Sequence, residues 1–358
     1  IRLEKSDKKR FKPNFTLEQL RERRRSVAQL LNNPLILRTF LEVYAGKGLP
    51  DLPSLEELMN NWFSRLSSIT NDNNQFLLDV TSIFLEKKKQ AIELDALYKD
   101  PRTAELIRRT DVAAPFTRLS RREGILAVSY GEVVEIFFAM DRYLEYVAAC
   151  CLSLDQKTEE PLGIIKLLED YESWPLIQET TRNLILMRVN QLGEKFLWQL
   201  IDEGGEPIIP LVGGVLASLL MSDRHLNKLV LGLTSEFSEF DLMTAVATLE
   251  ILDRELLHEL ASDFAIAVLA KIPSNFCVSA NEIILRSVAF SQLERSGRMS
   301  DLSIVSSIDV SRSQPEDVAL SVQIDQLRAR QYLSEGDQRQ ALEILLQRWL
   351  RASSALLL

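Results

Sequence analysis

Histidine and cysteine are scarce in this chain of 358 residues, which contains two histidines and three cysteines. His225 and His258 lie far apart in the sequence, and no cysteines or carboxylates cluster around them at the spacing of metal ligands. Zinc sites need three or four such ligands, so we expect no metal site. The same scarcity argues against histidine-dependent acid–base or nucleophilic catalysis, and we assign no catalytic residue.

A phosphate-binding loop is also absent. That motif, Gly-x-x-x-x-Gly-Lys-Ser/Thr, cradles phosphate with its backbone amides and binds magnesium through its hydroxyl group. Lys47 lies between Gly46 and Gly48, but no hydroxyl-bearing residue follows it. We therefore expect no cofactor in this chain and no enzymatic activity of its own.

Long hydrophobic runs are missing as well. The longest nearly uncharged apolar run, Ile208 to Met221, contains Pro210 and two glycines and is too short to span a bilayer. A buried helix is the better interpretation. No signal peptide opens the chain, and because it begins with Ile1 and not with Met, we expect a fragment or a processed product.

The three cysteines, Cys150, Cys151 and Cys277, are an odd set without CxxC spacing. We interpret them as small buried apolar residues in a reducing compartment. Together with the missing signal peptide and membrane span, this predicts a cytoplasmic protein.

The formal net charge is −9, yet residues 1–25 carry ten basic and four acidic residues, so the remainder is strongly acidic. An acidic body is not typical of a general nucleic-acid binder. Arg118, Arg121 and Arg122 form a basic cluster where a DNA-binding winged helix would enter the major groove. A solvated or inter-domain face is the favoured interpretation of that cluster, and nucleic-acid binding stays a minor alternative.

Hydrophobic periodicity predicts helices over most of the chain, with one exception. Residues 125–129 and 132–138 alternate as strands do, and Tyr130-Gly131 between them predicts a tight β-hairpin. Short helices precede the hairpin, and a polar break is predicted at residues 71–74. A closing helix follows, with Asp141 as its N-cap. Helices followed by one hairpin indicate a winged helix.

From about Glu159 onward the pattern is helical, in segments of 12 to 20 residues. Paired antiparallel helices of this length predict an α-solenoid. The last pair resembles a tetratricopeptide unit, with Gly336-Asp337 as the turn between its helices. The residues that carry this resemblance are Ala329, Tyr332, Ala341, Leu342 and Trp349.

Two stretches resemble signal-transduction ATPases of the NACHT type. The first is Asn33-Pro34-Leu35-Ile36-Leu37, followed by Tyr44, Gly46 and Leu49-Pro50. It is similar to the small helical domain that follows the ATPase core in that family, where the proline packs near the adenine base. The resemblance makes Pro34 the candidate nucleotide contact. Pro34 equally fits the first position of a helix, a role that needs no ligand.

The second stretch is the junction between the hairpin and the closing helix, where Phe138, Asp141, Glu145, Tyr146 and Ala149 match the family's pattern. The family usually has histidine before that aspartate, and it contacts the β-phosphate of bound ADP. Met140 occupies that position here. A thioether cannot donate a hydrogen bond or carry positive charge, so the phosphate contact is missing or replaced.

The resemblance implies a mainly α fold in three parts. Residues 1–70 are expected to form the small helical domain, residues 71–157 the winged helix with one β-hairpin, and residues 158–358 a solenoid of helical hairpins similar to tetratricopeptide or HEAT repeats. A parent protein would carry the P-loop ATPase core upstream, with ATP or ADP and magnesium.

The implied function is the regulatory and sensing portion of such an ATPase. Its helical array would recognise a protein or small ligand, and its partners would be the upstream core and further copies that assemble on activation. The alternative is a nucleotide-independent α-solenoid scaffold for protein–protein interaction. No membrane partner is expected.

Overall fold

The computed structural model describes residues 34–44, 55–69, 71–109, 111, 114–221, 226–235, 237–255, 257–273, 275–301 and 318–355. These residues are mainly helical and include a small antiparallel sheet, which confirms the expected mainly α class. They belong to two compact units, Ile1–Gly204 and Gly205–Leu358. The division into parts at residues 70 and 157 stays a prediction.

Some predicted features lie outside the described residues. They are Asn33, Gly46, Lys47, Leu49, Pro50 and His225, together with the side chains of Pro34 and Trp349.

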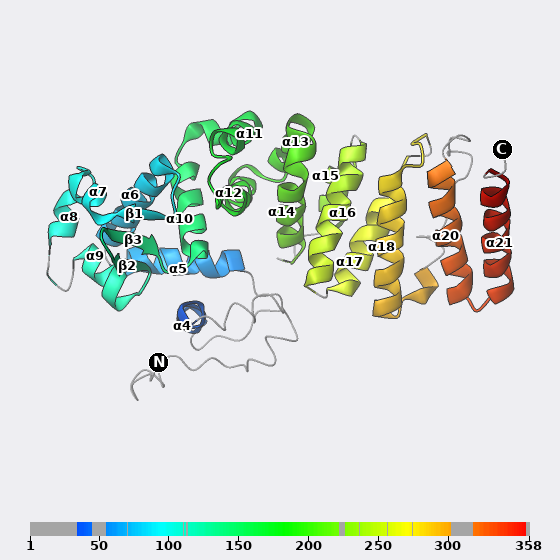
Figure 1. Cartoon of the computed structure of the whole chain (residues 1–358), viewed down its shortest axis with the longest axis horizontal. Helices are drawn as coiled ribbons and strands as arrows, with labels where there is room; N and C mark the ends of the chain where they lie inside the picture. The colour runs from blue at the N-terminus through cyan, green and yellow to red at the C-terminus, as the bar shows by residue number, and fades with distance from the viewer. Residues whose placement is uncertain are drawn as a thin grey trace. The chain divides into compact units, whose positions relative to one another are not determined.

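Within the described residues, the first unit consists of helices and the small sheet. In chain order its elements are α4 (Pro34–Val43), α5 (Leu55–Ile69), α6 (Asn71–Lys87), β1 (Ala91–Glu93), α7 (Leu94–Lys99), α8 (Ala104–Arg108), α9 (Pro115–Thr117), the π-helical turn η1 (Arg118–Arg122), β2 (Leu126–Tyr130), β3 (Val134–Phe138), α10 (Asp141–Ser153), the 3-10 turn η2 (Gln156–Glu159), α11 (Pro161–Asp170), α12 (Ile177–Leu192) and α13 (Lys195–Gly204). Figure 1 shows their arrangement.

The predicted hairpin is present as β2 and β3, but the sheet has a third strand that the sequence did not indicate. The strand order is β1-β3-β2, all antiparallel, and Ile136 pairs with Ile92 on one side and Val128 on the other. β1 has only three residues, too few for a period of two to be visible. Because Tyr130 pairs with Val134, the hairpin loop is the three-residue segment 131–133, and the predicted two-residue turn is wrong.

α10 is the central helix of this unit. Its residues from Tyr143 to Ala149 are all buried, so every face of the helix is covered along this stretch. It packs against α6 and α12, as Figure 1 shows. Aromatic contacts extend the core on both sides: the Trp62 ring lies 4.5 Å from the Tyr143 ring, and the Phe84 ring lies 5.5 Å from the Phe138 ring.

The predicted starts of two helices, α6 and α10, are wrong. The stretch 71–74, expected as a break, is the first turn of α6, and Asn73 in it is fully buried. Asparagine and aspartate favour helix starts as well as loops, so composition alone does not separate the two. The N-cap of α10 is Met140 and not Asp141, which occupies the first helical turn and there complements the helix dipole.

The three cysteines are less buried than expected. Cys277 is exposed, while Cys150 and Cys151 are partly buried on α10. Burial raises the pKa of each of these two thiols to about 12. A thiol with such a pKa stays protonated at neutral pH and is a poor nucleophile.

The second unit is a succession of helices. After the 3-10 turn η3 (Glu206–Ile208) come α14 (Ile209–Met221), α15 (Leu226–Leu233), α16 (Glu239–Arg254), α17 (His258–Leu269), α18 (Ala280–Ser296), the turn η4 (Met299–Asp301), α20 (Val318–Ser334) and α21 (Gln338–Ala355). α14, α16, α18 and α20 follow one another in one row, and α15 and α17 pack beside it (Figure 1).

Local sequence signals place the ends of these helices. α16 starts with a capping box in which Ser238 and Asp241 satisfy each other's backbone amides. Gly297 ends α18 in a left-handed conformation, φ 72°. The turn between α20 and α21 lies at Gly336-Asp337 as predicted, with φ 81° at the glycine.

The apolar run 208–221 contains α14, which is buried on all faces except at Pro210. None of the described helices is long and apolar enough to cross a membrane. A close helix contact in the second unit depends on Gly213, where an added Cβ would lie 2.7 Å from the Ala247 Cβ of α16.

Gly213→Ala is expected to destabilise the second unit. Alanine is the better helix former by about 1 kcal/mol, but overpacking against α16 costs about 1–3 kcal/mol, so the net loss is about 1 kcal/mol. Thermal unfolding followed by circular dichroism measures it. In the double variant Gly213→Ala/Ala247→Gly much of the loss should return, since the nearest atom is then gone. A melting temperature raised by Gly213→Ala contradicts the contact.

Arg188 is a second structural residue, because it closes the carboxyl end of α10. Its side chain is buried and donates hydrogen bonds to the carbonyl oxygens of Ser153 (2.8 Å) and Asp155 (3.0 Å) and to Thr158 Oγ1 (2.6 Å). Arg188→Met leaves these acceptors without their donor, so we expect a loss of about 3 kcal/mol in the free energy of unfolding of the first unit.

Tryptophan fluorescence during urea unfolding checks this, since Trp62, Trp174 and Trp198 all belong to the first unit. The matched control is Arg182→Met on the same helix, whose ion pair with Glu179 is partly exposed. That control should cost less than about 1 kcal/mol. Equal effects of the two variants would contradict the role of Arg188.

Candidate functional site

The two residues that the family resemblance singles out lie at the starts of two helices. Pro34 is the first residue of α4, a position at which its missing N–H costs nothing. Met140 immediately precedes α10, with an extended backbone (φ −147°, ψ 137°) and a partly exposed side chain. The Met140 carbonyl oxygen accepts a hydrogen bond from the Tyr143 amide at 3.1 Å.

α4 contacts α10 a few residues after Pro34 and after Met140. Thr39 Oγ1 and the Tyr143 hydroxyl lie 2.9 Å apart, and both side chains are buried. Tyr143 also packs on Trp62 of α5. Burial raises the pKa of Tyr143, so its hydroxyl stays neutral and remains able to donate. The structure thus brings the helices that follow Pro34 and Met140 into one buried contact.

Next to this contact lies a group of five charged side chains that we call the ionic cluster: Arg38, Glu42, Arg65, Arg118 and Glu123. Glu42 accepts from Arg38 at 2.9 Å and pairs with Arg65. Glu123 pairs with Arg38 at 3.2 Å and with Arg65 and Arg118 at 3.8 Å. Arg38 Nη1 also donates to the carbonyl oxygen of Arg122 at 2.8 Å.

Burial makes these pairs significant. The side chains of Glu42 and Glu123 are only 6% exposed, whereas those of Arg38 and Arg65 are 39% and 31% exposed. A carboxylate that loses its water must be compensated by charge or hydrogen bonds, so both glutamates depend on the arginines that share them. The cluster therefore connects α4, α5 and the end of η1.

The ionic cluster is suited to holding segments together and not to transferring protons. Both carboxylates are occupied by guanidinium groups, and arginine neither gives up nor takes a proton at ordinary pH. With three arginines and two glutamates, the cluster carries one excess positive charge.

The sequence did not indicate the ionic cluster. Only the spacing of Arg38 and Glu42, four residues apart on one helix, was a visible signal. Arg65 and Glu123 come from segments that are distant in the chain, and no local pattern relates them to α4.

The residues at the junction of β3 and α10, which form the second stretch that resembles the NACHT family, have packing roles. Phe138 packs in the core, and Tyr146 is buried with its hydroxyl 3.4 Å from Asn60 Oδ1. Glu145 is buried beside Arg142, whose guanidinium reaches Glu145 at 2.9 Å and Glu179 of α12 at 2.7 Å. Burial, the larger effect, raises the pKa of Glu145, while Arg142 opposes it.

The basic cluster before the hairpin is divided in the structure. Arg118 is 12% exposed and pairs with Glu123, so it does not face a duplex, whereas Arg121 and Arg122 are exposed. The segment that would enter a groove is the three-residue α9 followed by the π-helical turn η1. A recognition helix presents several base-contacting side chains along one regular face, and this segment offers little such length.

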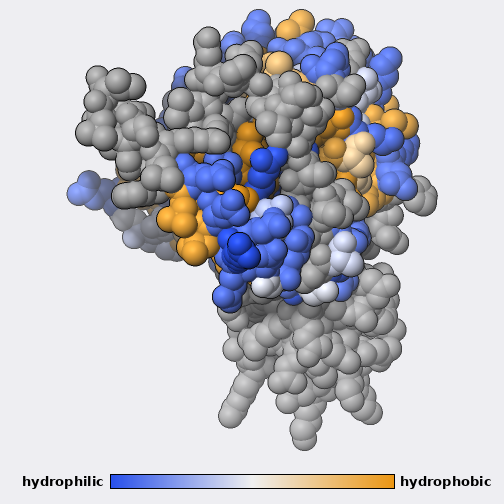
Figure 2. Space-filling view, turned by 90° about the vertical axis from the view of Figure 1, so that its right-hand side faces the viewer, coloured by the Kyte–Doolittle hydropathy of each residue, from blue (hydrophilic) through white to orange (hydrophobic). Residues whose placement is uncertain are grey.

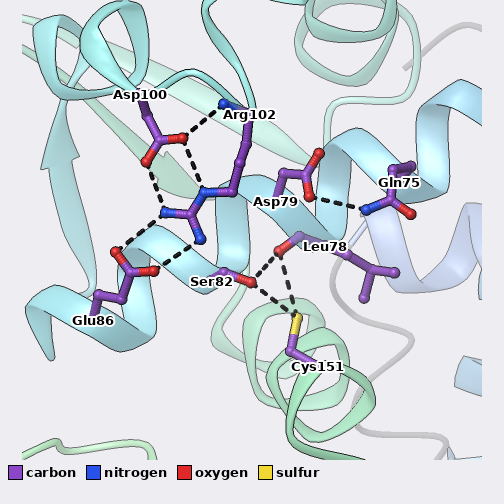
Figure 3. A network of polar contacts seen from close by, with 8 residues as sticks. All are labelled: Gln75, Leu78, Asp79, Ser82, Glu86, Asp100, Arg102 and Cys151. Atoms are coloured by element: carbon purple, nitrogen blue, oxygen red, sulfur yellow. Dashed lines mark hydrogen bonds and ion pairs between the residues drawn. The ribbon is translucent and has the colours of Figure 1, made fainter. Parts of the chain in front are cut away.

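A further polar network supports the sheet side of the unit. Arg102 donates to Asp100 and to both carboxylate oxygens of Glu86, with distances from 2.7 to 3.2 Å, and thereby fixes the turn before α8 to the end of α6 (Figure 3). The hydrogen bonds from Arg102 hold the pKa of Asp100 below its usual value. In the same view Ser82 and Cys151 both donate to the Leu78 carbonyl, joining α6 to α10.

Within the described residues, no group of three or more His, Cys, Asp or Glu side chains could hold a metal ion. His258 lies on α17 with its Nδ1 2.5 Å from Gln292 Oε1. The expectations that this chain binds no metal and performs no catalysis remain predictions.

The fold and these contacts are the basis for any functional assignment, because no family model, characterised protein or solved structure is detectably similar to this chain.

Proposed function

We propose that this chain is the regulatory and sensing portion of a NACHT-like signalling ATPase. Its first unit would couple the arrangement of domains to nucleotide state, and its second unit would recognise a ligand or partner. The chain itself would not be an enzyme, and it would act in the cytoplasm.

The order of elements in the first unit supports a winged helix. α6 is followed by β1, then by the short helices α7 to α9, and finally by the hairpin β2–β3. β1 completes the sheet by pairing with β3, on the side opposite β2. A strand between the first and second helices that joins the hairpin in one sheet is what a winged helix requires, beyond the hairpin that the sequence predicted.

The ionic cluster is the observation that carries the proposal. The resemblance assigns α4 and α5 to the small helical domain and Glu123 to the winged helix, and Glu42 and Glu123 share Arg38 and Arg65 across that boundary. Two domains that rotate against each other need an interface with two discrete arrangements. Buried ion pairs suit this purpose, since they are stable only while both partners are in place.

A direct nucleotide contact by the winged helix does not fit the residues present. Met140 cannot donate to a phosphate, and Glu145 and Tyr146 are buried in packing roles. In this proposal no residue of the winged helix contacts the phosphates of ADP or ATP. Pro34, at the start of α4, remains the proposed adenine-side residue, and the remaining contacts would come from the upstream core.

The alternative function, a scaffold for protein assembly, is favoured by a different observation. α21 exposes Leu342, Leu345 and Leu346, which are 59%, 40% and 50% exposed. On the side of the molecule where α21 lies, hydrophobic residues form patches between hydrophilic ones (Figure 2). Exposed apolar patches are typical of surfaces that bind other proteins, and a scaffold would need no nucleotide.

The ionic cluster predicts a specific local effect of Glu123→Gln. The variant keeps the shape of the side chain but removes its charge, so Arg38, Arg65 and Arg118 lose a shared partner. We expect α4 to open more readily by about 2 kcal/mol, or roughly 30-fold faster amide hydrogen exchange over residues 34–43. Glu132→Gln, in the exposed hairpin loop, is the control and should leave that exchange unchanged.

The functional proposal is tested by co-purifying this chain with the segment encoded upstream of Ile1, with and without ADP. A regulatory portion should bind that segment in ADP, and Glu123→Gln should weaken the complex while Glu132→Gln does not. Failure to bind in any nucleotide state favours the scaffold. ATP turnover by the isolated chain contradicts both functions.

A further inference from the structure

The second unit contains an open groove between α18 and α20. Its volume is about 680 Å³, and Asp253 of α16 and Leu345 of α21 complete its lining. Pockets that bind small molecules have volumes of about 300–1,000 Å³. The groove is therefore large enough to hold several residues of an extended peptide.

Apolar side chains in the groove are accessible to a ligand. Leu327 and Ile283 are buried at its base, at 1% and 3% exposure. Ile284, Leu333 and Leu345 also line the groove and are 42%, 53% and 40% exposed. A ligand that covers these three side chains gains hydrophobic free energy in proportion to the apolar area removed from water.

The acidic residue of the groove is already neutralised. Asp253 accepts a hydrogen bond from Gln292 Nε2 at 2.6 Å and pairs with Arg295. Gln292 is itself 1% exposed and uses its oxygen on His258. These contacts hold one wall of the groove in a fixed arrangement before any ligand arrives, which lowers the entropy lost on binding.

Arg330 on the opposite wall has a different environment. Its guanidinium group lies 4.7 Å from the centre of the Phe290 ring, and it donates to Ser291 Oγ at 3.3 Å. The ring contact orients the guanidinium group without neutralising it. Among the residues that the structure describes, no carboxylate forms an ion pair with Arg330, so within this part of the chain its positive charge is uncompensated.

We infer that this groove binds an extended peptide segment of a partner protein in which apolar and acidic side chains alternate. Arg330 would pair with a carboxylate of that segment, and the exposed leucines and Ile284 would cover its apolar side chains. Gln323 and Gln326 of α20 can exchange hydrogen bonds with its backbone, because each amide both donates and accepts. The inference rests on the proposed function only in taking the second unit as the part that recognises a partner.

Charge favours a peptide over nucleic acid. A nucleic-acid backbone presents one phosphate per nucleotide and needs several cations along its path. Among the described residues that line the groove, only Arg295 and Arg330 are cations, and Arg295 is already paired. The whole chain has a net charge of −9.

The test uses the full chain and two pools of acetylated, amidated octapeptides. One pool alternates Leu, Ile, Val or Phe with Asp or Glu, and the control pool has Asn or Gln in place of the acids. Affinity selection followed by mass spectrometry should enrich peptides of the acidic pool. The selected peptide, labelled with fluorescein, then gives a Kd by anisotropy for each variant.

Two variants with matched controls locate the site. Arg330→Gln should weaken the Kd about tenfold or more, since it removes a charge-assisted hydrogen bond. Arg339→Gln, an exposed arginine of α21 outside the groove, should not change it. Leu333→Asn should also weaken binding, whereas Leu231→Asn, 61% exposed on α15, should not.

Three results would overturn the inference: equal enrichment of both pools, unchanged affinity in Arg330→Gln, or tighter binding of a twelve-residue oligothymidine than of any peptide. Circular dichroism of each variant confirms that it is folded. The co-purification experiment depends on the first unit, whereas peptide selection depends on the groove. If co-purification fails and peptide selection succeeds, the proposed role in a signalling ATPase is contradicted and the peptide-binding groove is supported. If co-purification succeeds and peptide selection fails, only the inference about the groove is contradicted.

Discussion

The desolvation of two carboxylates, Glu42 and Glu123, is the constraint on which the first unit depends. Each is almost excluded from water, and each pairs with at least one arginine from another segment of the chain, Glu42 with Arg65 and Glu123 with Arg38 and Arg65. Removing one segment leaves an uncompensated buried charge, which costs far more than a surface ion pair contributes. The positions of α4, α5 and the turn before the hairpin are therefore interdependent, although 85 residues separate Arg38 from Glu123.

α10 joins several helices of the same unit. The helix is covered on every face from Tyr143 to Ala149, and it contacts α4 through Tyr143, α6 through Cys151 and α12 through Arg142. A change in the position of α4 must alter the Thr39–Tyr143 contact before it can reach α12. Under the proposed function, coupling between the helix that begins at Pro34 and the helices that follow the hairpin would need no phosphate contact at Met140, because it would run through these packed side chains.

The sequence predicts the repeated, local features of this fold and misses the distant ones. Helical periodicity locates α14 and the α20–α21 pair, and alternation locates β2 and β3, because these signals lie within one element. The three residues of β1 gain their structure only by pairing with β3, and Asn73 lies fully buried in the first turn of α6, which its residue type does not indicate. The ionic cluster was invisible for the same reason: only Arg38 and Glu42 lie on one helix. The two site residues taken from the resemblance both lie at helix starts, Pro34 as the first residue of α4 and Met140 directly before α10.

The ionic cluster and the groove arrange charge differently, and this difference fits the roles proposed for them, although the second unit also contains a buried internal ion pair between Glu282 and Arg286. In the first unit Glu42 and Glu123 are bonded internally, so the charges stabilise one arrangement of segments. In the groove Asp253 accepts a hydrogen bond from Gln292 and is neutralised by Arg295, while Arg330 is held in place by an aromatic ring that leaves its charge available. Orienting a cation without pairing it lowers the entropic cost of binding an anion, whereas pairing it internally would remove the attraction. An internal clamp and an available cation are what a protein needs if one part is to hold a conformation and the other is to recognise a partner.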